Sequence, residues 1–200
     1  MTVTNVLIAL NVVAYIWELT TGAMQSDPRL IAHGALYGPL VVVDHQYWRI
    51  VSSAFLHYGL VHISFNMFAL YQVGRFVEYA LGGPRMLAIY LIAMVGAGIS
   101  VVLFSYNLPT VGASGAIFGL FGALVAIGIR LGPRGRGIIG QTLPIIGINL
   151  VLGFTIPNIS MSAHIGGLLT GFVIGLALTM FPRVPAQAPA ALSEEVTQPE

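Results

Sequence analysis

Apolar residues fill six long runs along the chain, and polar or charged residues gather between them. The runs cover residues 3–22, 57–76, 86–105, 112–130, 138–155 and 163–181. Each run is close to the roughly 20 apolar residues that a helix needs to cross a bilayer. The pattern therefore predicts an all-α polytopic membrane protein, in which six transmembrane helices form one domain over residues 1–182.

The segments outside the clear runs are less regular. The fifth run is the weakest, because Pro144, Gly147 and Asn149 interrupt it. Segment 23–50 mixes apolar, aromatic and charged residues, so it could lie in the outer membrane interface or form an ordinary external loop. The proline- and glutamate-containing tail 183–200 is expected to be disordered and cytoplasmic. The first residues lack the positive region of a cleavable signal, so the first run should be kept as a helix.

Composition supports a membrane protein and excludes several kinds of chemistry. The chain is 56% hydrophobic and only 8% charged, whereas soluble domains carry about 25% charged residues. Its mean hydropathy is +0.88. A net charge of +1 argues against nucleic acid as a partner. The chain has no cysteine, which excludes disulfides, zinc–cysteine sites and thiol catalysis.

Arginine predicts the orientation of the bundle. Six arginines follow the second, fourth and sixth runs, namely Arg75, Arg85, Arg130, Arg134, Arg136 and Arg183. Only Arg29 and Arg49 fall on the other side. The positive-inside rule then places both termini in the cytoplasm. On this prediction, runs two, four and six all begin near the outer face.

Four polar residues lie near the starts of these three runs. His62 and Asn66 are four residues apart and therefore share one helix face. Ser114 stands near the start of the fourth run, and His164 near the start of the sixth. Polar groups at membrane depth are costly, so each needs a reason. Because the three runs begin on the same side, we expect the four side chains in one layer near the outer face.

Glycines predict how the fourth and sixth runs pack. After Ser114 the fourth run carries Gly115, Gly119 and Gly122, and after His164 the sixth carries Gly166, Gly167, Gly171 and Gly175. Small residues let helix backbones approach closely in a membrane. We therefore expect these two helices to pack face to face, which would bring Ser114 beside His164.

A serine beside a histidine can carry out nucleophilic catalysis. The His164 imidazole could take the Ser114 proton and later return it to the leaving group. Free backbone N–H groups surround Ser114 at its helix start, and with His62 and Asn66 they could bind an oxyanion. No acidic residue lies near enough in sequence to complete a triad, because Asp27 and Asp44 are in the outer loop and Glu18 lies toward the outer end of the first run. We therefore predict a two-residue dyad.

Each of these residues also has a structural interpretation. A serine in a glycine-rich span often serves as a hydrogen-bonding contact between helices, and a lone histidine is usually a satisfied polar group. The pair His62 and Asn66 could contribute about 0.6–2 kcal/mol in this way. For His57 we favour a structural role that fixes the outer loop. A catalytic role is favoured because Ser114 and His164 are expected in the same layer of the membrane.

Together these motifs resemble the rhomboid family of intramembrane serine proteases. The similarity covers about residues 45–180 and includes Trp48-Arg49, His62 with Asn66, Gly112-Ala-Ser114-Gly115, and Ala163-His164-Ile-Gly-Gly. The resemblance implies a six-helix core with Ser114 as nucleophile, His164 as base, and oxyanion contacts from His62 and Asn66. It also implies that single-pass membrane proteins are cleaved near the outer face.

The resemblance assigns supporting roles as well. Trp48 and Arg49 would dock the first loop, and Glu78 with Arg75 matches a structural position of the family. Phe118 is a departure, because many members carry tyrosine four residues after the serine. Its ring should still pack on His164, whereas a hydrogen bond from a hydroxyl is lost. In the family picture, substrate enters between the second and fifth helices.

Three other functions remain open from the sequence. His57, His62 and His164 could hold zinc, although no HExxH motif is present. Intramembrane polar residues and broken helices also occur in transporters, and a binding module with a dead site is possible. On the protease interpretation we expect no metal or other cofactor, the lipid bilayer and transmembrane proteins as partners, and an unknown oligomeric state. A bacterial or archaeal plasma membrane is the expected location.

Overall fold

A computed structural model describes residues 2–155 and 159–180, and most of this part is helical. The helices are α1 (Val3–Thr21), α2 (Asp27–Ala32), α3 (Gly38–Val42), α4 (Arg49–Ser52), α5 (Leu60–Ala69), α6 (Arg75–Leu81), α7 (Gly83–Phe104), α8 (Ser114–Arg130), α9 (Arg136–Thr155) and α10 (Met161–Thr179). A π-helical segment, η3 (Leu70–Gly74), joins α5 to α6. Shorter 3₁₀ turns are η1 (Ala23–Gln25), η2 (Ser53–Phe55) and η4 (Gly132–Gly135). The predicted tail 183–200 lies outside the described residues.

Four stretches in the described part are long and apolar enough to cross a membrane. They are α1, α7, α10 and Gly132–Gly153, which includes most of α9. The prediction of six uniform spans is therefore supported only in part. α8 has 17 residues, which at 1.5 Å per residue gives about 25 Å, less than the roughly 30 Å of hydrocarbon. The predicted bounds of the second helix, 57–76, were wrong. The helix begins at Leu60 and continues through η3 to Leu81.

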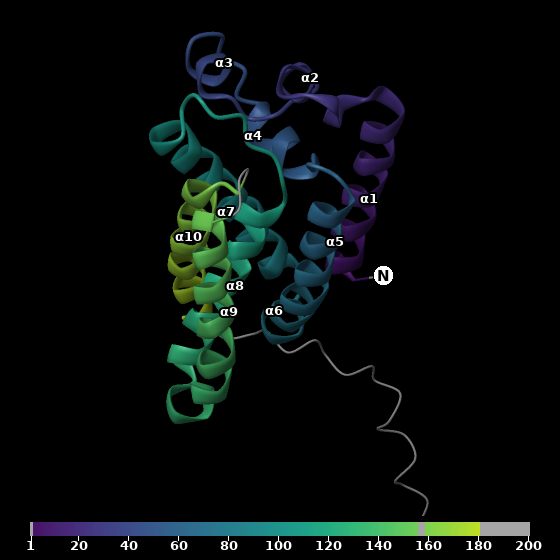
Figure 1. The fold of residues 1–200 in the computed structure, drawn as a ribbon. Helices are drawn as coiled ribbons and strands as arrows, with labels where there is room; N and C mark the ends of the chain where they lie inside the picture. The colour runs from purple at the N-terminus through teal and green to yellow at the C-terminus, as the bar shows by residue number, and fades with distance from the viewer. Residues whose placement is uncertain (1, 156–158, 181–200) are drawn as a thin grey trace, which may run out of the picture.

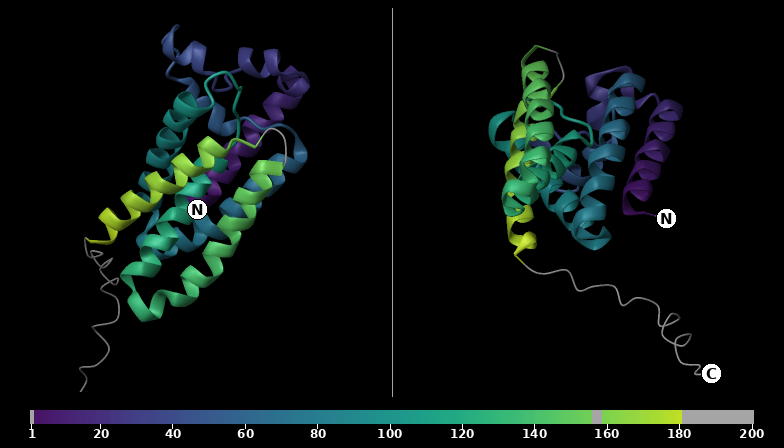
Figure 2. Two further views of the ribbon diagram at one scale, coloured as in Figure 1. Left: turned by 60° about the vertical axis from the view of Figure 1, so that its left-hand side comes forward. Right: turned by 90° about the horizontal axis from the view of Figure 1, so that it is seen from below.

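Helix α8 occupies the centre of the bundle (Figures 1 and 2). Most of its residues are buried, and it packs against α7, α9 and α10. The predicted glycine contact between the fourth and sixth runs is confirmed. A Cβ added at Gly167 or at Gly171 would collide with the carbonyl oxygen of Gly115 or of Gly119, respectively. Bare backbone thus touches bare backbone along the α8–α10 contact, which lets the two helices approach closely.

Short helices cover one end of the bundle, where segment 23–50 runs between α1 and α5 (Figure 1). This segment is folded into α2, α3 and the start of α4, a regularity that the sequence had left open. Arg49 organises it, because its guanidinium donates to the carbonyl oxygens of Ile31 and Ala35 at 2.6 and 2.9 Å. The same guanidinium lies 4.7 Å from the ring centre of Trp48. Burial lowers the pKa of Arg49, and the opposing effect of nearby Asp44 is smaller. An arginine stays charged under such a shift.

At the opposite end of α1, Glu78 holds the start of the helix. Its carboxylate accepts the backbone N–H of Val3 at 2.7 Å and the backbone N–H and hydroxyl of Thr4 at 3.0 and 2.6 Å. These bonds satisfy donors that a helix start leaves free. A structural role for this glutamate agrees with that geometry.

Candidate active site

Ser114 and His164 face each other across the α8–α10 contact. Ser114 is the first residue of α8, and His164 lies in the first turn of α10. The imidazole Nε2 is 2.9 Å from the serine Oγ. That distance is the one a general base needs to take the hydroxyl proton. The geometry comes from the glycine contacts, which bring the two helix starts together.

Helix α8 also holds the His164 ring from one face. The Phe118 ring stacks on it with centroids 4.0 Å apart and planes 10° apart. The expected packing of an aromatic ring at position 118 on His164 is thus confirmed. His164 is 6% exposed, and its Nδ1 is buried without a hydrogen-bond partner among the described residues. Within the described residues, no third side chain therefore bonds the second nitrogen of His164.

His62 lies beside this pair, with its ring directed by the backbone around it. The N–H of Tyr58 donates to its Nδ1 at 3.3 Å. A nitrogen that accepts a hydrogen bond carries no proton, so the other nitrogen, Nε2, must carry it. A Cβ added at Gly112 would lie 2.9 Å from that Nε2 and 3.7 Å from the Oγ of Ser114. His62 Nε2 and Ser114 Oγ therefore both lie around the empty side of Gly112.

Asn66 is placed one helical turn below His62. Its Nδ2 donates to the carbonyl oxygen of His62 at 2.9 Å, and its side chain is largely buried at 6% exposure. An amide carries two N–H bonds, so this contact leaves one for another acceptor. Oxyanion binding by Asn66 stays a prediction.

The loop before α8 sets the position of Ser114. Gly112 donates its N–H to the carbonyl oxygen of Ser53 at 2.8 Å, and Thr110 forms a two-residue antiparallel bridge with Leu36. At Gly115, an added Cβ would lie 2.6 Å from the Cβ of Ala97. Both glycines of the Gly112–Gly115 motif are therefore required by close contacts.

Comparison with known proteins agrees with this arrangement. The rhomboid domain family profile matches residues 44–181, which include every residue of the site. The chain belongs to the rhomboid family. It is an integral membrane protein, as the rhomboid domain and the apolar helices of the described part indicate.

Curated rhomboid relatives come from bacteria and plants. The chain is 38% identical to rhomboid protease GluP of Bacillus subtilis over 178 residues, which are 88% of this chain and 35% of the relative. It is 40% identical to RHOMBOID-like protein 2 of Arabidopsis thaliana over 161 residues, 79% of this chain and 50% of that protein. Inactive RHOMBOID-like protein 8 of the same plant is 31% identical over 78% of this chain and 45% of its own length. The chain thus spans about a third to a half of these relatives.

The three histidines that could hold zinc in principle, His57, His62 and His164, make other contacts in the structure. His164 pairs with Ser114, and His57 packs its ring edge-on against His62 with centroids 5.1 Å apart. No group of three potential metal ligands is gathered anywhere in residues 2–155 and 159–180.

Glu18 is the residue near the site whose contacts the sequence did not reveal. Its sequence position indicates only a residue too distant to complete a triad, whereas its carboxylate accepts the backbone N–H of His57. The available signal was its place inside an apolar helix, where a carboxylate is costly without a partner.

Proposed function

We propose that this rhomboid protein is an intramembrane serine protease, with Ser114 as nucleophile and His164 as general base. The observation that carries the proposal is the 2.9 Å contact between His164 Nε2 and Ser114 Oγ. The name of the relative GluP, a rhomboid protease, supports the same activity.

The reaction uses the dyad twice. His164 takes the proton of Ser114 as the serine oxygen attacks the peptide carbonyl carbon, and the carbonyl oxygen becomes an oxyanion. The protonated imidazole then gives its proton to the leaving nitrogen as the carbon–nitrogen bond breaks, which leaves an acyl-enzyme. Water, deprotonated by His164, attacks the ester, and the serine oxygen leaves with the proton. The proposed oxyanion donors are the His62 Nε2–H, the Asn66 amide and the Ser114 backbone N–H.

The proposed substrates are transmembrane proteins, cut close to one membrane face. α8 begins at Ser114 and is shorter than a full span, so its start would be recessed from the surface. A peptide bond of a membrane-spanning segment could reach the serine there once the helix locally unwinds. A single-pass protein presents such a bond with one end of its chain free to extend.

The name of one relative favours a second candidate, an inactive member of the family. Inactive RHOMBOID-like protein 8 matches 78% of this chain, so family membership alone does not imply catalysis. An inactive protein would bind transmembrane segments without cutting them. The close pairing of Ser114 with His164 favours the protease.

The decisive experiment is covalent labelling of the purified protein, in detergent and in liposomes, with a fluorophosphonate probe. Wild type should label, and Ser114→Ala and His164→Ala should not. Ser162→Ala is a matched control, because its hydroxyl lies in the first turn of α10 and bonds Ser105 at 2.7 Å. It should label as wild type does. A folded wild type that stays unlabelled in both media would contradict the protease proposal.

A further inference from the structure

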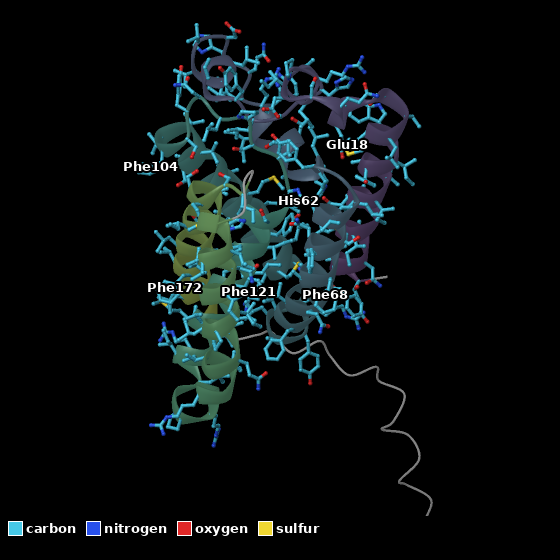
Figure 3. All side chains as sticks on the ribbon, viewed as in Figure 1. Glu18, His62, Phe68, Phe104, Phe121 and Phe172 are labelled. Atoms are coloured by element: carbon cyan, nitrogen blue, oxygen red, sulfur yellow. The ribbon has the colours of Figure 1, made fainter. Side chains whose placement is uncertain are left out.

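An acidic side chain is buried in the apolar helix α1. Glu18 is 0% exposed and lies near the end of α1 that meets the short helices. Both of its carboxylate oxygens are 3.0 Å from the backbone nitrogen of His57, which donates to them. Figure 3 shows Glu18 and His62 at the same end of the bundle. A buried carboxylate in a membrane protein is costly, so it points to a role.

The backbone that Glu18 holds is in direct contact with His62. We call residues 57–58 the His57–Tyr58 turn. The His57 ring packs edge-on against the His62 ring, with centroids 5.1 Å apart. The Tyr58 N–H donates to His62 Nδ1 at 3.3 Å. The turn therefore contacts His62 by a ring and by a hydrogen bond.

The hydrogen bond from Tyr58 decides which nitrogen of His62 carries the proton. With Nδ1 accepting, the proton is on Nε2, the nitrogen next to Gly112 and Ser114. If the turn moved, the imidazole could place its proton on Nδ1 and present a bare Nε2 to the site. A bare nitrogen cannot donate to an oxyanion and would repel it.

We propose that Glu18 is a positioning residue, which holds the His57–Tyr58 turn so that His62 presents its Nε2–H beside Ser114. The proposal rests on the proposed function, because it assigns Glu18 to the oxyanion donor of that reaction. It requires a hydrogen-bond acceptor at position 18, and glutamine can supply one.

Two substitutions separate this role from simple helix stability. Glu18→Gln keeps an acceptor of the same length, and Glu18→Met removes it at similar volume. Asn11→Leu is the matched control, because Asn11 is also a 0% exposed polar residue of α1 and bonds the Leu7 carbonyl oxygen at 2.8 Å. It removes a buried polar group from the same helix without touching the turn.

The measurement is the rate of fluorophosphonate labelling at increasing probe concentrations. It gives a limiting rate and the probe concentration at which half of that rate is reached. Glu18→Met should lower the limiting rate about 10- to 100-fold, since a misplaced group costs on this order. The half-saturating concentration should stay the same. Glu18→Gln and Asn11→Leu should stay within about threefold of wild type. Wild-type labelling by Glu18→Met, or an equal loss in Glu18→Gln, would overturn the proposal.

A double-mutant cycle with His62→Ala tests the connection itself. If Glu18 acts through His62, then adding Glu18→Met to His62→Ala should cost less than about twofold more. Independent, multiplying losses would overturn the proposal. A wild type that never labels at Ser114 would instead contradict the protease function, so the two failures are distinguishable.

The proton position on His62 can be measured without a destabilising variant. Nitrogen NMR of histidine-labelled wild type should show a proton on Nε2 of His62 and none on Nδ1. This measurement also serves if Glu18→Met does not fold. A proton on Nδ1 would overturn the proposal.

Discussion

The space between His62 and Ser114 depends on a single glycine. Gly112 has φ +123°, a conformation that residues with a side chain rarely adopt. A Cβ at this position would lie 2.8 Å from Cε1 of His62 and 2.9 Å from its Nε2. Glycine is therefore needed at position 112 both for the backbone conformation of its own turn and to leave room for His62 on α5.

Gly112→Ala should slow labelling about 100-fold or more, because the new methyl group displaces His62. Gly132→Ala is the control. It also has positive φ, at +58°, yet a Cβ there meets nothing within 4 Å. It should cost stability alone, about 1–3 kcal/mol of backbone strain. Equal labelling losses in both variants would show that strain, not the clash, is responsible.

A second prediction at the scale of single residues concerns the ring of Phe118. Phe118→Leu removes the ring stacked on His164 and should slow labelling about 2- to 10-fold, as expected for an aromatic pair. Phe121→Leu is the control, because Phe121 is also buried in α8 and its ring lies 6.0 Å from that of Phe118. Its labelling should match that of wild type. A normal rate in Phe118→Leu would leave the stacked ring without a role in catalysis.

At the scale of elements, the α8–α10 contact determines whether the dyad can form. Its glycines place backbone against backbone, and Ser114 and His164 stand at the same end of that contact. In a membrane, helices associate by close packing, since lipid tails are as apolar as the side chains they would replace. The glycines are thus the basis of both helix association and the site.

Gly171→Ala should therefore destabilise the protein, although alanine favours helix formation. Its Cβ would meet the Gly119 carbonyl oxygen, and overpacking of this kind costs about 1–3 kcal/mol. Gly140→Ala in α9 is the control, because nothing lies within 4 Å of its added Cβ. Thermal unfolding in detergent should separate the two variants. A Gly171→Ala protein as stable as Gly140→Ala would contradict the close contact.

At the scale of the whole molecule, the distribution of arginine predicts the orientation in the membrane. The short helices and the η4 turn lie at opposite ends of the bundle (Figure 1). Arg130, Arg134 and Arg136 are exposed at the η4 end. The positive-inside rule predicts that this end lies in the cytoplasm and that Ser114 and His164 lie toward the outer side.

The absence of cysteine from the chain makes this orientation directly testable. We expect Asp44→Cys to react with a membrane-impermeant maleimide on intact cells, because Asp44 is exposed between α3 and α4. Arg134→Cys should react only after the cells are opened. Wild type, without a thiol, is the blank. The reverse pattern would invert the proposed topology.

Much of this protein could be predicted because local sequence carries the signal. Apolar runs predict helices wherever lipid is the solvent, since the backbone must satisfy its own hydrogen bonds there. Ser114 and His164 stood out because polar groups are rare in such runs, and the glycines predicted which helices touch. His62 and Asn66 stood out in the same way, as polar residues on one helix face, and the family resemblance added Trp48, Arg49 and the departure at Phe118.

Tertiary structure alone decided how these parts are adjusted to one another. The second run starts at Leu60 and passes through a π segment, a change that apolar periodicity does not record. The proton position on His62 depends on the Tyr58 N–H, and the turn that carries it is held by Glu18 from another helix. The apolar pattern and the helix preferences of residues act locally, so the sequence by itself determines where the helices form. A hydrogen bond between residues 39 positions apart exists only once the chain has folded.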